Sequence, residues 1–209
     1  MEYALPLAGV ALAHLLAAIS PGPSFMLVSR VAVAGSRRQG LVAALAMGVG
    51  AATWAAAALL GLAVVFARFE VVYAALRVAG GLYLVVLAVL LWRGAGKDTR
   101  PPDAGALPDG PGLGRVFRQA LLTQLANPKV AVFFGGIFVT LLPQGWPGWV
   151  AAAAIAIVLL DETLWYAVVA TAFSTAGPRR VYQRVRPTLD RVLAGVLAGL
   201  GAKLILDRA

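Results

Sequence analysis

Long apolar segments separated by short polar connections dominate the pattern of this chain. About 20 apolar residues cross a bilayer as a helix, and six segments approach or exceed that length: 5–34, 40–66, 71–92, 115–142, 148–173 and 189–206. Their hydrophobic residues follow one another continuously, which argues against the alternating pattern of a membrane β-barrel. The pattern therefore predicts an all-α integral membrane protein with six transmembrane helices.

Proline interrupts two of these segments. The first contains Pro21-Gly22-Pro23 and the fourth contains Asn127-Pro128-Lys129. Proline removes one backbone donor and clashes with the preceding turn, so each helix is expected to break there. Inside a membrane, such a break is tolerated where protein covers the freed backbone or where it lines a polar cavity. Breaks at matching positions of two halves are typical of a transport site.

Residues 94–114 form the one stretch that resembles a linker, because Gly, Pro and Asp dominate it and no apolar face could anchor it. This loop divides a single transmembrane domain (1–209) into halves of about 1–93 and 115–209. Each half has three expected spans. Three is an odd number, so the second half is expected to lie upside down in the membrane relative to the first. Two unrelated proline kinks remain the alternative.

Composition agrees with a membrane protein. Of the 209 residues, 61% are hydrophobic and 13% are charged, and the mean hydropathy is +0.85. A soluble domain of this size needs far more charge on its surface. The chain has no cysteine and one histidine, so disulfides and thiolate metal sites are excluded. We expect neither a metal site nor a cofactor.

The net charge of +9 could suggest nucleic acid, but the basic residues lie in short connections between apolar spans. Arginines gather in the odd-numbered connections, whereas the other side has Arg68 balanced by Glu70 and an uncharged segment at 144–148. This distribution follows the positive-inside rule. We therefore expect a lipid bilayer and no nucleic acid as partner, with the odd connections in the cytoplasm and both termini outside.

Three charged residues are expected at membrane depth. Lys129 follows the break in the fourth span, and Asp161 and Glu162 lie near the middle of the fifth. Each such charge costs about 2.5–3.5 kcal/mol to insert, so each needs a reason. The simplest arrangement pairs Lys129 with one of the acids. Adjacent helix positions point about 100° apart, so one acid should face a cavity and the other a neighbouring helix. A substrate or proton site is favoured over a purely structural ion pair, which stays open.

The residues after each break suit a bound carboxylate. The two second helices begin with Ser24 and Lys129, whose free backbone donors form positive helix starts. Asn127 caps the later helix or contacts the ligand, and Gly22 permits close backbone approach. A zwitterionic amino acid matches this set, with its carboxylate at a helix start and its ammonium at an acid. His14 stands alone among Ala and Leu and is interpreted as a packing residue.

Several motifs follow one another in a fixed order: Pro21-Gly22-Pro23, Gly35-Ser36-Arg37-Arg38-Gln39-Gly40, Arg77-Val78-Ala79-Gly80-Gly81-Leu82-Tyr83-Leu84, Gln124-Leu125-Ala126-Asn127-Pro128-Lys129, Asp161 with Trp165-Tyr166, and Gly199-x-Gly201. One motif alone would be a weak signal, but together they cover nearly the whole chain apart from 94–114. In this order the chain resembles the LysE/RhtB superfamily of bacterial amino-acid exporters. The resemblance implies a small inner-membrane carrier that exports amino acids or related metabolites with the proton gradient.

One position departs from the family pattern. Some members have an acidic residue just after the second-span glycine, where this chain has Ala51. If that acid helps to hold a basic side chain, lysine and arginine are less expected as substrates here. The apolar side chains expected near the cavity, Phe25, Met26 and Trp54, would suit a neutral amino acid.

The sequence thus predicts a secondary transporter of the bacterial inner membrane and no enzyme. The residues expected to bind the substrate are Pro21, Gly22, Pro23, Ser24, Asn127, Pro128, Lys129 and Asp161. The residues expected to couple protons are Asp161 and Glu162. An exporter of another solute, such as a metal cation or a toxic metabolite, is the alternative; a membrane-embedded enzyme or a passive scaffold is less favoured. Gly195 and Gly199 form a GxxxG pattern that fits either a homo-oligomer or packing within the bundle.

Overall fold

The structure is a computed structural model that describes residues 2–20, 22–68, 70–94, 112–142, 145–172 and 176–206. The described residues are almost entirely helical, and no strand occurs among them. The helices are α1 (Ala4–Ile19), α2 (Pro23–Ala34), α3 (Arg37–Arg68), α4 (Glu70–Gly94), α5 (Leu113–Leu125), α6 (Pro128–Leu141), α7 (Gly148–Ala172) and α8 (Ala176–Leu206).

Both expected helix breaks are present. The first apolar segment forms α1 and α2, which are bent by 60° relative to each other, and the fourth forms α5 and α6 with Ala126 and Asn127 between them. Pro23 and Pro128 are the first residues of α2 and α6. At that position the missing N–H would have no helical partner anyway, and the fixed backbone angle suits the helix. Each proline therefore starts a new helix where the previous one ends.

Length and hydropathy identify up to three membrane spans among the described residues. Residues Arg37–Gly61 of α3 and Gly148–Ala172 (α7) are each long and apolar enough to cross a membrane, and the bent pair α1–α2 is a third if it forms one span. The protein is therefore all-helical, with helices of membrane-spanning length. The other three expected spans stay a prediction.

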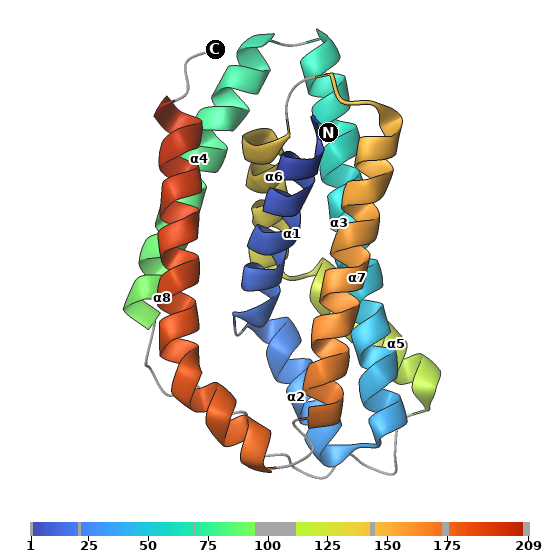
Figure 1. The fold of residues 1–209 in the computed structure, drawn as a ribbon. Coiled ribbons are helices and arrows are strands. Elements are labelled where there is room, and N and C mark those ends of the chain that lie inside the picture. Colours follow the sequence, from blue (N-terminus) through green and yellow to red (C-terminus); the bar gives the residue numbers. More distant parts are fainter. Residues whose placement is uncertain are drawn as a thin grey trace.

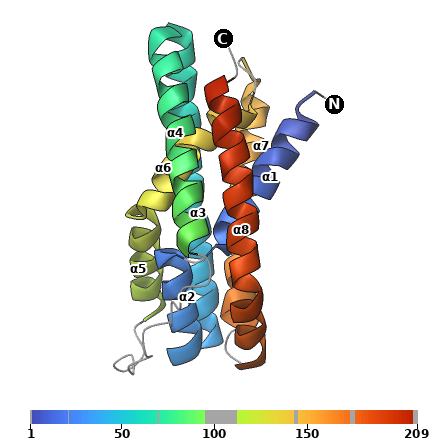
Figure 2. The same cartoon turned by 90° about the vertical axis from the view of Figure 1, so that its left-hand side faces the viewer.

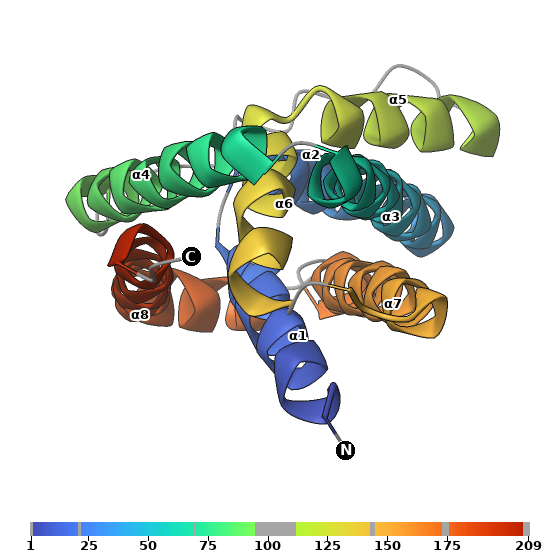
Figure 3. The same ribbon diagram turned by 90° about the horizontal axis from the view of Figure 1, so that it is seen from above.

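Two long helix pairs flank the centre of the bundle. α3 packs along α7, and α4 packs along α8. Seen from above, the shorter α1 and α6 lie between the two pairs, and α5 lies outside α3 (Figure 3). Both breaks lie near the middle of the bundle's height (Figure 1). The interrupted helices thus bring their broken ends together at the centre of the molecule.

Glycine permits close approach within both long pairs. A Cβ atom at Gly48 of α3 would collide with Thr163 of α7 and would lie 2.9 Å from the carbonyl oxygen of Leu159. A Cβ atom at Gly201 of α8 would lie 2.7 Å from the carbonyl oxygen of Gly81 of α4. Small residues at such crossings let membrane helices pack closely. The two long pairs are therefore held by backbone contact as well as by side chains.

The last helix begins earlier than the sequence indicates. The expected span starts at residue 189, whereas α8 starts at Ala176 and contains Pro187. The arginine-rich segment expected to be a connection therefore forms the first turns of α8. Arginine is a good helix former, and hydropathy marks only the apolar part of a helix that continues into a polar segment.

The two ends of the bundle differ in charge. α1 begins and α8 ends at the same end of the bundle, where α3 also ends and α7 begins (Figures 1 and 2). The starts of α3, α5 and α8 lie at the opposite end. That end carries the arginines of these helix starts, including Arg37, Arg38, Arg115 and Arg118. The charge segregation seen in the sequence is therefore also a segregation in space.

Candidate functional site

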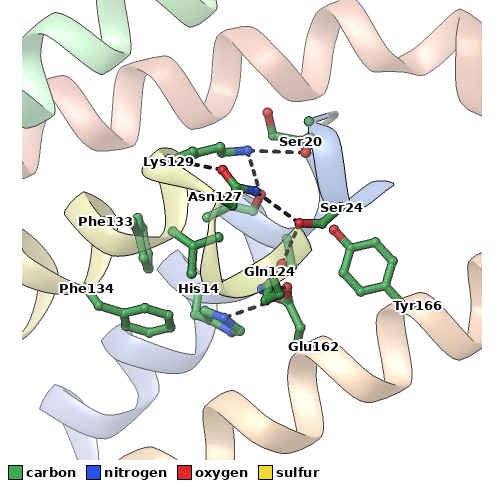
Figure 4. A pocket seen from close by; sticks show the side chains of 14 residues that line it. His14, Ser20, Ser24, Gln124, Asn127, Lys129, Phe133, Phe134, Glu162 and Tyr166 are labelled. Atoms are coloured by element: carbon green, nitrogen blue, oxygen red, sulfur yellow. Dashed lines mark hydrogen bonds and ion pairs between the residues drawn. The ribbon is translucent and has the colours of Figure 1, made fainter. Parts of the chain in front are cut away.

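Lys129 connects the second helix break to the first. Its Nζ, on the first turn of α6, donates hydrogen bonds to the carbonyl oxygens of Ala17 (3.1 Å) and Ser20 (3.2 Å). These carbonyls lie at the end of α1, where backbone acceptors lack partners within their own helix. A cation also stabilises the negative end of a helix. Lys129 therefore caps α1 from another helix (Figure 4).

The end of α5 is covered in a similar way. Trp54 of α3 donates its Nε1–H to the carbonyl oxygen of Leu125 at 3.2 Å. At both breaks, a side chain from a different helix thus satisfies a carbonyl that the interrupted helix cannot. A break in hydrocarbon requires such cover.

Asn127 provides a second connection between the breaks. Its Oδ1 accepts a hydrogen bond from the backbone N–H of Lys129 at 3.1 Å and so caps α6. Its Nδ2 donates to Ser24 Oγ at 3.0 Å, and Ser24 Oγ donates to Gln124 Oε1. The start of α2 is therefore fastened to the end of α5 and the start of α6.

The polar network continues from Gln124 to α1. Gln124 Nε2 donates to Glu162 Oε1 at 2.6 Å, and Glu162 Oε2 lies 3.4 Å from His14 Nε2. The other ring nitrogen, His14 Nδ1, lies 3.6 Å from Asp161 Oδ2. The imidazole thus stands between two carboxylates of α7. In the described structure, no group of three or more His, Cys, Asp or Glu side chains is placed to hold a metal ion.

These groups surround a small cavity between the breaks (Figure 4). Its volume is about 30 Å³, which is room for water but is far less than a typical small-molecule site offers. The polar side chains of its wall are those of His14, Ser20, Ser24, Gln124, Asn127, Lys129 and Glu162. Phe133, Phe134 and Tyr166 supply aromatic rings. A ligand of amino-acid size therefore requires the helices around the cavity to move apart.

Most break residues expected from the sequence meet at this cavity. Its wall includes Gly22, Ser24, Asn127 and Lys129. Pro23 and Pro128 lie outside the cavity wall, and each starts the helix that follows its break. Pro21 lies outside the described residues.

The two acids of α7 have different surroundings. Glu162 is 4% exposed and lines the cavity, whereas the side chain of Asp161 is 22% exposed and lies outside the cavity wall. Within the described structure neither acid forms the ion pair with Lys129 that the sequence suggests, and both face His14 instead. His14 also stacks on Phe134, with ring centroids 5.4 Å apart. Packing against Phe134 therefore explains the position of the ring face of His14, but its two nitrogens lie within the candidate site.

Sequence reasoning misses Gln124 and Asp190. Gln124 is fully buried and links Ser24 to Glu162. Asp190 of α8 is 2% exposed and accepts a hydrogen bond from Ser20 Oγ at 3.3 Å. Each is a polar residue within a segment expected to cross the membrane, and its polar character there was the available signal. Gln124 joins α5, and Asp190 joins α8, to the same polar centre.

Comparison with known proteins identifies relatives along nearly the whole chain. The family model for the LysE type translocator matches residues 15–208. The threonine efflux proteins of Escherichia coli (strain K12) and Salmonella typhi are 33% and 34% identical over 199 and 203 residues, and each match covers 95% of this chain and 97% of the relative. A homoserine/homoserine lactone efflux protein of Salmonella typhi is 35% identical over 78 residues, covering 37% of this chain and 36% of the relative. No solved structure gives a significant match.

The family match confirms the resemblance seen in the ordered motifs, and it covers both helix breaks and the acids of α7. Because these relatives are transporters, the protein is not an enzyme. The chain therefore belongs to the LysE type translocator family.

Proposed function

We propose that this protein is a secondary transporter that exports a small neutral amino acid, or a close derivative, across the bacterial inner membrane with the proton gradient. The observation that carries the proposal is the cavity between two broken helices, with Lys129 and a helix start at one end and Glu162 at the other (Figure 4). Opposite charges on one small cavity suit a zwitterion. Breaks at membrane depth are characteristic of transport sites.

In this proposal, the substrate carboxylate binds at Lys129 and at the start of α2. An ammonium group has three donors, and Lys129 uses two of them on the carbonyls of Ala17 and Ser20. A carboxylate takes the third or replaces the carbonyls, since hydrogen bonds between charged groups are the stronger ones. The start of α2 adds a positive helix end. The substrate ammonium binds the carboxylate of Glu162.

The amide and hydroxyl groups suit a substrate that itself carries a hydroxyl. Ser24, Gln124 and Asn127 exchange hydrogen bonds with one another, and each can turn to a substrate hydroxyl instead. Two relatives are named for efflux of threonine and of homoserine or its lactone, and both amino acids have a side-chain hydroxyl. Ala51 is fully buried in an apolar cluster and offers no acid to a basic side chain. Threonine is therefore the first substrate to test.

For the whole chain we propose one transmembrane domain of six spans, built as two inverted halves with broken first and fourth spans. Two observations support this arrangement: both breaks lie at matching heights, and α1 begins at the same end of the bundle where α8 ends (Figure 1). We place the arginine-rich end in the cytoplasm and both termini outside, following the positive-inside rule. Because the cavity is too small for threonine, export requires it to open first to one side and then to the other.

Flux into and out of proteoliposomes tests the proposal. The full chain is reconstituted and assayed with labelled threonine and with a mixed pool of amino acids, with and without an imposed proton gradient. We expect gradient-dependent movement of threonine or another small neutral amino acid, and little movement of lysine or arginine. Liposomes without protein give the background. If folded protein moves no amino acid, the exporter of another solute becomes the better proposal.

A further inference from the structure

His14 occupies a position that amino-acid binding alone does not explain. It is the chain's one histidine, it is 3% exposed, and it lies on the cavity wall. Stacking on Phe134 fixes the plane of its ring. In that plane, both ring nitrogens are directed at carboxylates of α7 (Figure 4 shows the contact with Glu162).

The distances from the His14 nitrogens to the two carboxylates leave the imidazole ready to form new hydrogen bonds. The separations of 3.4 Å to Glu162 and 3.6 Å to Asp161 are longer than hydrogen bonds. Within the described structure, His14 Nδ1 and Asp161 Oδ2 are both buried without a hydrogen-bond partner, and they face each other. Proton-transfer contacts are often long in unliganded structures and shorten when the site is filled. A shift shorter than a covalent bond would bring both contacts within hydrogen-bond distance.

We propose that His14 carries the proton that couples export to the proton gradient, with Glu162 as its exchange partner; this inference rests on the proposed amino-acid export. The proton passes from Nε2 of the imidazolium to Oε2 of Glu162, so that an ion pair becomes a neutral imidazole beside a neutral carboxyl group. The reverse transfer restores both charges. Asp161 holds the Nδ1–H throughout and is a positioning residue, because it fixes which nitrogen exchanges the proton.

Glu162 links the proton to the substrate. The same carboxylate is the proposed partner of the substrate ammonium, and a carboxyl group that holds a proton no longer attracts an ammonium. Binding of the amino acid from the cytoplasm therefore displaces the proton from Glu162 through His14 to the cytoplasmic side. Release of the amino acid outside lets Glu162 take up a proton from that side through His14. Histidine suits this task because its imidazole can take up or release a proton at one ring nitrogen while the other keeps its own.

Three helices packed against α1 place titratable or charged groups near His14. They are Asp161, Glu162 and Tyr166 of α7, Lys129 of α6 and Asp190 of α8. Among the described residues, the two acids of α7 are the ones within ion-pair distance of the imidazole. Lys129 binds the carbonyls at the end of α1, and Asp190 accepts from Ser20. The geometry therefore assigns the exchange to α7.

A single histidine makes its protonation directly measurable in the unmodified protein. The full chain is produced with isotope-labelled histidine and a histidine-free affinity tag, reconstituted in lipid, and studied by NMR with and without threonine. The imidazole nitrogen signals report which ring nitrogen carries a proton. We expect the Nε2 signal to change when threonine is added, because substrate binding displaces the proton from Glu162 through Nε2. An Nε2 signal that does not respond to transported threonine would overturn the inference.

A His14→Gln variant tests whether the proton moves with the substrate. A pH-sensitive dye inside proteoliposomes records threonine-driven proton movement, and labelled threonine records counterflow without a gradient. We expect His14→Gln to lose proton movement and the pH dependence of counterflow, and Asp161→Asn to keep proton movement with a shifted pH profile. Ser29→Ala removes a buried hydroxyl of α2 outside the cavity wall and should match the original protein. Proton movement with an unchanged pH profile in His14→Gln would contradict the proposal.

Counterflow by the unmodified protein separates this inference from the proposed function. If the protein exchanges no amino acid, the proposed function itself fails. If it exchanges threonine and no proton moves with it, amino-acid export stands and the coupling role of His14 is wrong.

Discussion

At the scale of single residues, Lys129 shows how a charge can be kept inside an apolar bundle. Its ammonium binds two carbonyls at the end of α1, and hydrogen bonds to charged groups contribute about 1.5–3 kcal/mol each. Inserting such a charge costs about 2.5–3.5 kcal/mol, so the two bonds together can offset the insertion without a carboxylate partner. The remaining donor is then available to a substrate.

A Lys129→Met variant tests the carboxylate site. Methionine keeps much of the apolar volume but removes the ammonium, so we expect threonine flux in proteoliposomes to fall by at least about tenfold, equivalent to about 1.4 kcal/mol. Lys203→Met removes a lysine from the exposed last turn of α8 and should transport normally. Undiminished flux in Lys129→Met would remove Lys129 from the proposed site.

Asn127 combines two contacts that substitution can separate. Asn127→Ala loses both the helix cap and the bond to Ser24, so we expect the free energy of unfolding to fall by about 1–3 kcal/mol. Asn127→Ser keeps an oxygen suited to capping and should recover part of this loss. Thermal unfolding in detergent measures both variants. Equal losses would show that the cap contributes little.

At the scale of helices, the crossing of α3 and α7 sets how α7 is rotated. Gly48 lets α3 approach Leu159 and Thr163, which flank the two acids along α7. With Thr163 turned toward α3, Glu162 points to the cavity and Asp161 lies beside it, outside the wall. A change in this crossing would therefore move the acids as well as the helices.

A Gly48→Ala variant is expected to destabilise the bundle. The added Cβ meets a backbone oxygen, which cannot rotate away, and overpacking of this kind costs about 1–3 kcal/mol. The better helix propensity of alanine returns at most about 1 kcal/mol. Gly61→Ala on the same helix meets no atom within 4 Å and should lose no stability. Detergent unfolding compares them, and equal stability of the two variants would contradict the tight crossing.

At the scale of the whole molecule, charge separation predicts the orientation in the membrane. The starts of α3, α5 and α8, which lie at one end of the bundle (Figure 1), carry arginines. Among the described residues, the opposite end has Arg68 and Lys203 but no such cluster. Cytoplasmic connections are the ones that hold excess Lys and Arg. The arginine-rich end is therefore expected on the cytoplasmic side.

Cysteine labelling checks this orientation without background, because the chain has no cysteine. Ser36→Cys is exposed between α2 and α3, and Gly148→Cys is exposed at the start of α7, at the other end. An impermeant maleimide should label Ser36→Cys in inside-out vesicles and Gly148→Cys in right-side-out vesicles. The unsubstituted protein controls for non-specific labelling. Labelling of both positions from one side would contradict the six-span arrangement.

The sequence by itself determined the features that depend on neighbours along the chain. Pro23 and Pro128 start α2 and α6, and Asn127 caps α6, because backbone angles and caps involve only a few adjacent residues. Hydropathy located the apolar helices for the same reason. It failed at the start of α8, where a helix continues through an arginine-rich segment that carries no apolar signal.

Only the tertiary structure decided which side chains meet. Lys129 binds the backbone of α1, Glu162 takes the cavity side of α7, and His14 stands between the two acids. A sequence gives the angle between adjacent positions on a helix, but it does not give the direction in which the helix face points. That direction is set by contacts between residues distant in the chain, such as Gly48 with Thr163, and it exists only once the whole bundle has packed.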